Sequence, residues 1–449
     1  MPPANHQGIP ESARITRRQF VTRVGLAGLS AAAVTTLLSG PTAAAPLQAP
    51  TYQAQRAVSL WHIFSTIGSQ EDAMKAVVLN FEQTHSGIRV DANEVQREDI
   101  KVLAPSVMRT SRAPDVIQYR TISSARIGYD AGLVTDISDL WQQNGWQQMF
   151  GSLSSNAQWK SKYWNIPWNI DSFPGFWYLT DDWQQRGFQA PTNYDRLEQV
   201  FAAYKSAGMY PLLVANIEKW HLPYLVEYVI LGIGGRPTWV GLTDGSVHWT
   251  DDRVRASFRR VADWINKDYF YPNMNAYKIE DVFPFWLGGQ AALIPGGSWL
   301  ITAADSGHRT TEYFQQPTMS PDIQNAVAAS TEPFSIPARA EHPAEAKLLL
   351  TYLASAEAQQ IFANIALQPM ANVGVDHSKL PGPVQHNLKD VRTGPAVLGF
   401  DWDLPEPVFT AAWAGIQQLV DSPNDDSIDS ILNAVQTSAD EYFQGQGAG

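Results

Sequence analysis

The chain has 449 residues and a formal net charge of −12, and it contains no cysteine. Its length allows two or more domains with sizeable cores. The acidic charge argues against nucleic acid or an anionic membrane surface as a partner. The lack of cysteine excludes disulfide bonds and a thioether-linked lipid anchor.

The first 45 residues predict an export signal. Arg17 and Arg18 are followed by Phe20, by an apolar run over residues 24–38 and by three alanines at 43–45. This order is typical of a secretory signal peptide, and the paired arginines resemble the twin-arginine export signal of bacteria. The run is shorter than the ~20 residues that cross a bilayer, so a permanent anchor is the less favoured alternative. We expect residues 1–45 to be removed, leaving a soluble periplasmic or extracellular protein.

Residues 46–56 are rich in Pro, Gln and Ala and predict a disordered spacer. Residues 58–61 then alternate like a strand, and residues 69–72 have the sequence of a capping box that starts a helix over 70–81. Further strands are expected at 88–90 and 115–117. Strands that alternate with helices predict a parallel α/β sheet.

Later segments continue this pattern. Nine aromatic residues fall between positions 159 and 183. Helical spacing recurs at 194–207, at 253–267 and at 428–442. Residues 343–365 predict two helices that are broken near Ser355, whose hydroxyl can cap the second.

Eight segments match, in order, those typical of one family. The chain resembles the extracellular solute-binding proteins of ABC transporters, in particular the sugar-binding branch that includes the maltose-binding proteins. Each match is weak alone, but together they span residues 57 to about 370. They are Trp61 and His62 with Gly68 and Ser69; 80–82 with 87–90; 114–117; 131–136; 163–167; 176–178; 289–293 with 297–299; and 352–359.

The resemblance implies a two-lobed α/β fold of the periplasmic-binding-protein type. Each lobe would be a mostly parallel sheet flanked by helices, and the chain would cross the hinge between them several times. We therefore expect lobe one at 57–168 and 314–375, and lobe two at 169–313 and 376–449. The implied function is a monomeric receptor that carries a sugar or oligosaccharide to a membrane permease, without a metal or cofactor.

The chemistry of sugars independently suggests which residues to look for. A sugar offers apolar C–H faces and a rim of hydroxyl groups, so its site should combine Trp or Tyr with Asp, Asn, Gln or His. A site that hydrogen-bonds each hydroxyl rejects analogues lacking one, because its own polar groups are left unpaired.

The family pattern implies several ligand contacts at matching positions. Trp299, after Gly297 and Ser298, would stack on a sugar ring, and Tyr119 would be the aromatic residue past the third strand. Asp171 would be a ligand-binding carboxylate just past the first hinge crossing. Weaker candidates are its neighbours Trp168 and Asn169, and the second-lobe pair Trp220 and His221. For any of the tryptophans, packing in a core is the competing interpretation.

Residues near the first strand are further candidates. Ser65 and Thr66 follow that strand at the carboxyl edge, where α/β sheets receive ligands. His62 could donate to a hydroxyl or be a hydrogen-bonded core histidine. Ser69 is expected to cap a helix, and Asp115 to hold the backbone of its turn.

A secreted glycoside hydrolase is the alternative, and it would need two carboxylates flanking the scissile bond. The candidates are Asp181, Asp182, Asp251, Asp252, Glu332, Asp401 and Asp403. The sequence contains no nucleophile elbow, zinc-protease motif or phosphate loop, and its nine His lack metal-ligand spacing. We therefore expect no catalysis. A structural or adhesive protein would show repeats, which are absent.

Overall fold

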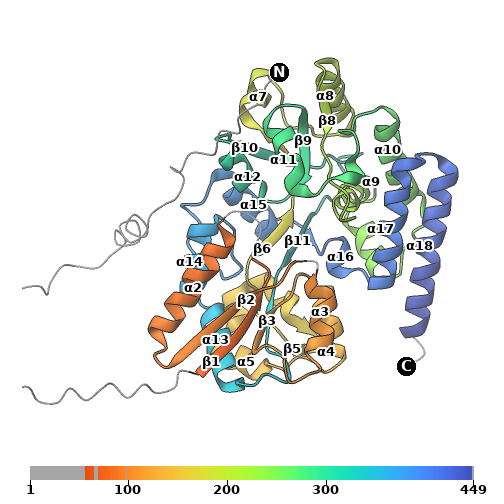
Figure 1. Ribbon diagram of the computed structural model, residues 1–449. Helices are drawn as coiled ribbons and strands as arrows, with labels where there is room; N and C mark the ends of the chain where they lie inside the picture. Colours follow the sequence, from red (N-terminus) through yellow and green to blue (C-terminus); the bar gives the residue numbers. More distant parts are fainter. Residues whose placement is uncertain (1–55, 65–68, 98, 447–449) are drawn as a thin grey trace, which may run out of the picture. The chain divides into compact units, whose positions relative to one another are not determined.

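A computed structural model describes residues 56–64, 69–97 and 99–446. The predicted signal peptide and nearly all of the spacer lie outside the described residues, as do Ser65 and Thr66. Three sheets organise the remainder (Figure 1). None of the helices in the described ranges has the length and hydropathy needed to span a membrane.

The first sheet has the strand order β12-β3-β1-β2, with β1 at Arg56–His62, β2 at Ile88–Glu94, β3 at Val116–Gln118 and β12 at Phe334–Ser335. β1 pairs in parallel with both β2 and β3, whereas β12 is antiparallel to β3. Because side chains alternate across a strand, Val116 packs into one core and the adjacent Ile117 into another. The predicted strands 58–61, 88–90 and 115–117 thus all form in one sheet.

Helices cover both faces of this sheet. On the Val116 face lie α2 (Gln70–Thr84), α13 (Pro343–Ala354) and α14 (Ala356–Ala366), and on the Ile117 face α3 (Asp99–Val107) and α4 (Ile122–Asp130). The predicted break at Ser355 is confirmed, because its hydroxyl accepts from the Ala358 amide. The capping box at Ser69 is wrong. That hydroxyl instead donates to the Ile365 carbonyl at 2.6 Å and joins α2 to α14.

The second sheet has the order β10-β7-β9-β8, with β7 at Gly175–Leu179, β8 at Tyr210–Leu212, β9 at Ala291–Gly296 and β10 at Thr311–Gln315. The prediction of a mostly parallel sheet is wrong here, since β7 runs antiparallel to both neighbours and only β8 and β9 are parallel. Phe314 pairs with a residue of β7 and packs in the core of the second sheet. Ala326 and Ala328 pack in the same core. These three residues fall in the sequence range expected for lobe one.

A third sheet, β13-β11-β6, lies between the other two in Figure 1. Its strands are β6 (Ile170–Phe173), β11 (Val327–Thr331) and β13 (Ala396–Val397). β6 and β11 are antiparallel, and Asp171 lies opposite Ser330. The chain therefore passes between the two larger sheets along β6 and again along β11. A two-stranded ribbon pairs β4 (Gln158–Trp159) with β5 (Lys162–Tyr163).

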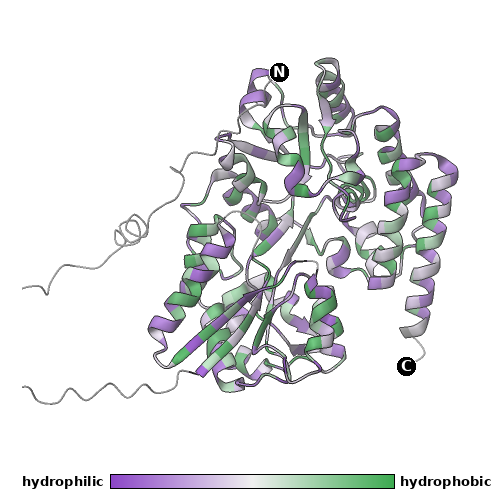
Figure 2. Ribbon diagram, in the orientation of Figure 1, coloured by the Kyte–Doolittle hydropathy of each residue, from purple (hydrophilic) through white to green (hydrophobic). Residues whose placement is uncertain are grey.

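The remaining helices mostly surround the second sheet. Their apolar stripes are visible in Figure 2, and that of the last helix is buried through Ile428, Leu432 and Val435. They are α5 (Ser138–Asn144), α6 (Trp146–Phe150), α7 (Thr180–Gln185), α8 (Tyr194–Ser206), α9 (His221–Asp244), α10 (Asp252–Asn266), α11 (Ile279–Leu287), α12 (Leu300–Ser306), α15 (Gly382–Thr393), α16 (Phe400–Asp403), α17 (Glu406–Asp421) and α18 (Asp425–Gln446), with 3-10 turns at Gly151–Ala157 and Met274–Ala276.

Helix α16 joins the core of the second sheet to α3 and α4. Asp401 accepts a hydrogen bond from Tyr224 at 2.9 Å and lies 3.3 Å from the Lys101 ammonium. Asp403 pairs with Arg126 at 2.9 Å. Both carboxylates are therefore held in ion pairs between elements of different cores.

Candidate ligand-binding cavity

The main cavity has a volume of about 720 Å³ and is lined from both large sheets. This size is within the range of small-molecule sites. From the first sheet, Arg97 follows β2 and Arg120 follows β3, at the carboxyl edge of parallel strands. From the second, Ser298 and Trp299 follow β9.

Aromatic rings form one wall. The Trp220 and Trp299 ring centroids are 6.3 Å apart at 78°, and Phe173 meets Trp220 at 6.0 Å and 71°. The Trp299 ring folds back over Gly297, where a Cβ atom would come within 2.7 Å of the indole nitrogen. Glycine at this position therefore allows the ring to lie against its own turn. The result is an edge-to-face aromatic corner.

Charged and amide side chains form the opposite wall and the floor. Glu332, directly after β11, is only 2% exposed, pairs with Arg97 and accepts from the Asn169 amide at 2.9 Å. The Arg120 guanidinium lies 3.7 Å from Glu332 and 3.6 Å from Asp171. Two carboxylates and two guanidiniums thus face one another at the floor.

Burial and the neighbouring Glu332 charge raise the pKa of Asp171 to about 6, although Arg120 and Arg97 act in the opposite direction. Two buried atoms of this network, Arg97 Nε and Asn169 Oδ1, have no hydrogen-bond partner among the described residues. Buried polar groups are normally paired. The protein's own hydrogen bonds therefore leave this network partly unsatisfied.

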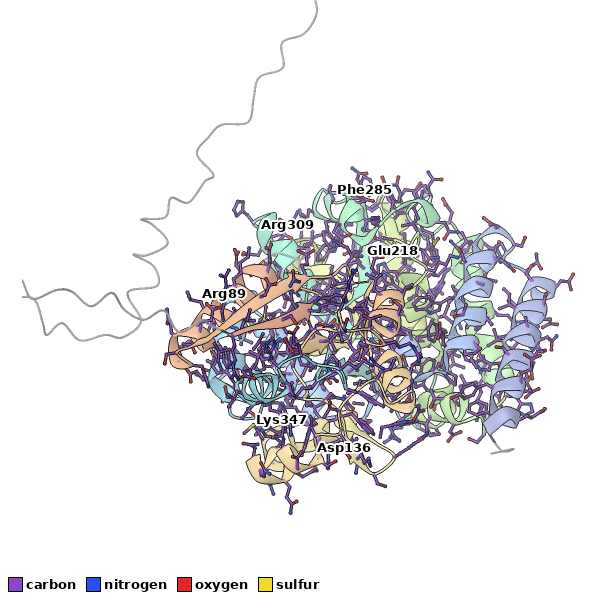
Figure 3. All side chains as sticks on the ribbon, turned by 60° about the horizontal axis from the view of Figure 1, so that its bottom comes forward. Arg89, Asp136, Glu218, Phe285, Arg309 and Lys347 are labelled. Carbon is purple, nitrogen blue, oxygen red and sulfur yellow. The ribbon has the colours of Figure 1, made fainter. Side chains whose placement is uncertain are left out.

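The solvent-exposed rim of the lining includes Gln96, Asp99, Lys278 and Glu280, with Glu218 half-buried. Figure 3 shows Glu218 in the middle of the molecule, near the orange ribbon of α3 in that view, and Asp99 begins this helix. Acidic groups outnumber basic ones at this rim.

Four of the predicted ligand contacts line the cavity, namely Trp299, Trp220, Asp171 and Asn169. Tyr119 does not, because it is buried against α3 and α4 and its hydroxyl lies 3.2 Å from the Met108 sulfur. Trp168 is fully buried and meets Phe334 and Phe362 edge-on.

The two predicted histidines are also core residues. His221 Nδ1 accepts from the Ala215 amide at 3.0 Å, and Nε2 lies 2.6 Å from the Pro295 carbonyl. His62 Nδ1 accepts from the Phe64 amide at 3.3 Å. Burial lowers the pKa of each imidazole to about 4. Both rings are therefore neutral hydrogen-bonding parts of the interior, and neither lines the cavity.

Arg97, Arg120 and Glu332 were not predicted from the sequence to bind a ligand. The positions of Arg97 and Arg120, just past two expected strands, were the available signal. Glu332 had none for binding, because its partners are distant in sequence. Asp115 holds backbone as expected, but that of distant segments and not of its own turn, because it accepts from the Ser59 and His342 amides.

The other carboxylates considered for hydrolysis lie elsewhere. Asp181, Asp182 and Asp251 pair with arginines, and Asp401 and Asp403 with Lys101 and Arg126. Only Glu332 lines the cavity, beside Asp171. Within the described ranges, no group of three or more His, Asp or Glu side chains could hold a metal ion.

Comparison with known proteins identifies the family. The sequence profile of the bacterial extracellular solute-binding proteins matches residues 67–360. The chain belongs to this family. Its members are receptors rather than enzymes, which confirms the resemblance and excludes the hydrolase alternative.

Two relatives illustrate the family's range. A Pyrococcus horikoshii ABC transporter extracellular-binding protein is 24% identical over 400 residues, covering 87% of this chain and 89% of the relative. The multiple sugar-binding protein of Streptococcus mutans is 23% identical over 253 residues, covering 53% of this chain and 58% of the relative.

Solved structures confirm the periplasmic-binding-protein fold. The bacterial solute receptor AcbH, described as preferring β-D-galactopyranose, has a TM-score of 0.80 at 18% identity, covering 87% of this chain and all of AcbH. The binding protein RafE in complex with raffinose has a TM-score of 0.72 at 17% identity, covering 86% and 99%.

Replacing Asp171 with Asn should stabilise the unliganded protein at pH 8. The raised pKa means that the ionised carboxylate is disfavoured in the folded state, so the native protein binds this proton more tightly than the unfolded chain. The gain should be on the order of 1–3 kcal/mol above pH 6 and should shrink as the pH falls from about 6 toward 4. Chemical denaturation across this range measures it.

Asp181→Asn is the matched control, since the Arg309 ion pair lowers the pKa of Asp181 and no stabilisation is expected. An Asp171→Asn variant less stable than the parent at pH 8 would show that Arg120 holds the carboxylate ionised at no cost.

Proposed function

We propose that this receptor binds a sugar or short oligosaccharide in the cavity and delivers it to the permease of an ABC transporter. The observation that carries the proposal is that two kinds of side chain line one cavity. Phe173, Trp220 and Trp299 supply aromatic rings, and other lining residues supply guanidinium, carboxylate and amide groups. These are the two surfaces that a ring with apolar faces and a hydroxyl rim requires.

The binding movement follows from the arrangement of the cores. We infer that lobe one comprises residues 57–168 and the chain from β12 to about residue 375, and lobe two residues 169–313 and 376–449. Residues 314–328, expected in lobe one, belong with lobe two, because Phe314, Ala326 and Ala328 pack in the core of the second sheet. A ligand that contacts both walls binds better when they approach, so it shifts the open–closed equilibrium toward the closed form. The closed, monomeric receptor would then dock on the permease.

The first test is a thermal-shift screen of the mature chain against a panel of neutral sugars. A ligand at ~100 times its dissociation constant adds ~2.7 kcal/mol of stability, so the matching sugar should raise the melting temperature. The same sugar should be recovered chemically unchanged after prolonged incubation. Stabilisation by none of the panel, or release of reducing ends, would contradict the proposal.

Truncating Trp299 to Ala should weaken sugar binding roughly thirtyfold, because central aromatic anchors contribute ~2 kcal/mol or more. The ring lines the cavity but is only 8% exposed and also packs in the core of the second sheet, so the variant should lose some stability and still fold. Trp286→Ala is the control, because that ring is fully buried beside β9. It should lose ~3–5 kcal/mol of stability while the folded fraction keeps its affinity.

Calorimetry and denaturation on both variants separate the two roles. A Trp299→Ala protein with a large stability loss and native affinity would show that the ring stabilises the core and does not bind the sugar.

We also propose that residues 1–45 direct export through the twin-arginine route. Replacing both Arg17 and Arg18 with Lys should leave folded precursor inside the cell, as measured by fractionation and immunoblotting. Changing Arg14 and Arg23 to Lys is the control, because these residues lie outside the pair and export should persist. Normal export of the Arg17→Lys, Arg18→Lys variant would instead assign the general secretory route.

A further inference from the structure

Two arginines reach the cavity floor, and neither is a simple anion-binding group. A guanidinium in a concave site is well suited to bind a carboxylate or phosphate through paired hydrogen bonds. Arg97 and Arg120 would supply two such guanidinium groups. Both nevertheless face Glu332, and Arg120 also faces Asp171. Their positive charge is therefore matched by carboxylates of the protein itself.

Glu332 is fixed in this position by its surroundings. It is 2% exposed, and its second oxygen accepts from the Asn169 amide at 2.9 Å. Its backbone follows directly on β11, whose pairing with β6 also positions Asp171. Breaking a buried ion pair leaves an uncompensated charge and is strongly unfavourable. An incoming anion could not readily displace Glu332 from Arg97.

We propose that Glu332 is a specificity-determining residue that restricts the cavity to neutral sugars. It occupies the guanidinium groups that would otherwise bind the carboxylate of a uronic acid or the phosphate of a sugar phosphate. This proposal rests on the proposed sugar-binding function and defines the class of sugar accepted.

The remaining lining supports the same selectivity. Among the lining residues, Asp99 and Glu280 are exposed and Glu218 is half-buried, against one exposed lysine, Lys278, so an anionic sugar entering the cavity meets more negative than positive charge on its exposed lining. Neutral hydroxyl groups behave differently, because each can donate to a carboxylate and accept from a guanidinium without displacing either. Selectivity thus comes from the Glu332 carboxylate, which competes with an anionic ligand for the arginines, as well as from attraction to the neutral ligand.

Glu332→Gln tests the proposal, because the amide keeps the shape of the side chain but removes its charge. The probes are sodium sulfate and sodium D-glucuronate, each compared with sodium chloride at equal ionic strength by thermal shift and calorimetry. The parent protein should show no stabilisation beyond chloride. The variant should bind at least one probe saturably, with an affinity about tenfold or more above that of the parent.

Two further variants tie the effect to the arginines. Adding Arg97→Gln to Glu332→Gln should abolish the gained anion binding. Asp171→Asn removes the other carboxylate that faces Arg120 and should produce a smaller gain, which keeps the proposal testable even if Glu332→Gln folds poorly. Glu332→Asp retains the charge and should continue to reject both anions.

Saturable binding of sulfate or glucuronate by the parent protein would overturn the proposal. So would the absence of any anion gain in both Glu332→Gln and Asp171→Asn, which would assign Glu332 a purely structural role. The neutral-sugar screen of the parent protein reports on the proposed function separately, since anion exclusion is measured without a neutral ligand.

Discussion

The antiparallel pairing of β6 with β11 is the constraint on which the rest of the cavity depends. Its register sets Asp171 opposite Ser330 and Thr331 opposite Ile170, so Glu332 emerges next to Asn169. These two strands also lie between the larger sheets. The same backbone hydrogen bonds that connect the two halves of the molecule therefore place two carboxylates at the floor between them.

Bringing two carboxylates into a poorly solvated site is unfavourable unless opposite charges accompany them. Arg97 and Arg120 provide those charges from the loops after β2 and β3. The floor is consequently made from four separate segments, and none of them could hold it alone. Burial first, and then the charge of Glu332, raise the pKa of the Asp171 carboxyl despite the nearby arginines.

The tryptophans fall into two groups according to whether they line the cavity. Most tryptophans fill the cores, and Trp177 and Trp264, for example, are fully buried. Trp220 and Trp299 differ because each lies at the N-terminal end of a helix where a loop meets the cavity, before α9 and α12. Both rings line the cavity while also packing against the core of the second sheet, Trp299 as a buried member and Trp220 as a partly buried one.

Local sequence determined the secondary structure well. Alternation at 58–61, the helical spacing after residue 69 and the serine at 355 are all short-range features, and the corresponding elements form. The order of eight short segments was also enough to assign the family, because these segments are spread over residues 57 to about 370. The resemblance to the family also predicted four residues that line the cavity, namely Trp299, Trp220, Asp171 and Asn169.

Tertiary structure alone decided the charged floor and the fate of the core residues. Nothing within a few positions of Glu332 indicates that Arg97, 235 residues away, is its partner. Likewise His221 and Tyr119 have residue types suited to a sugar, but their side chains point into packed interiors. Residue type and spacing determine which local element forms. Whether a side chain on that element faces a cavity or a core depends on how distant strands pair, and that pairing energy is not contained in any single segment of the sequence.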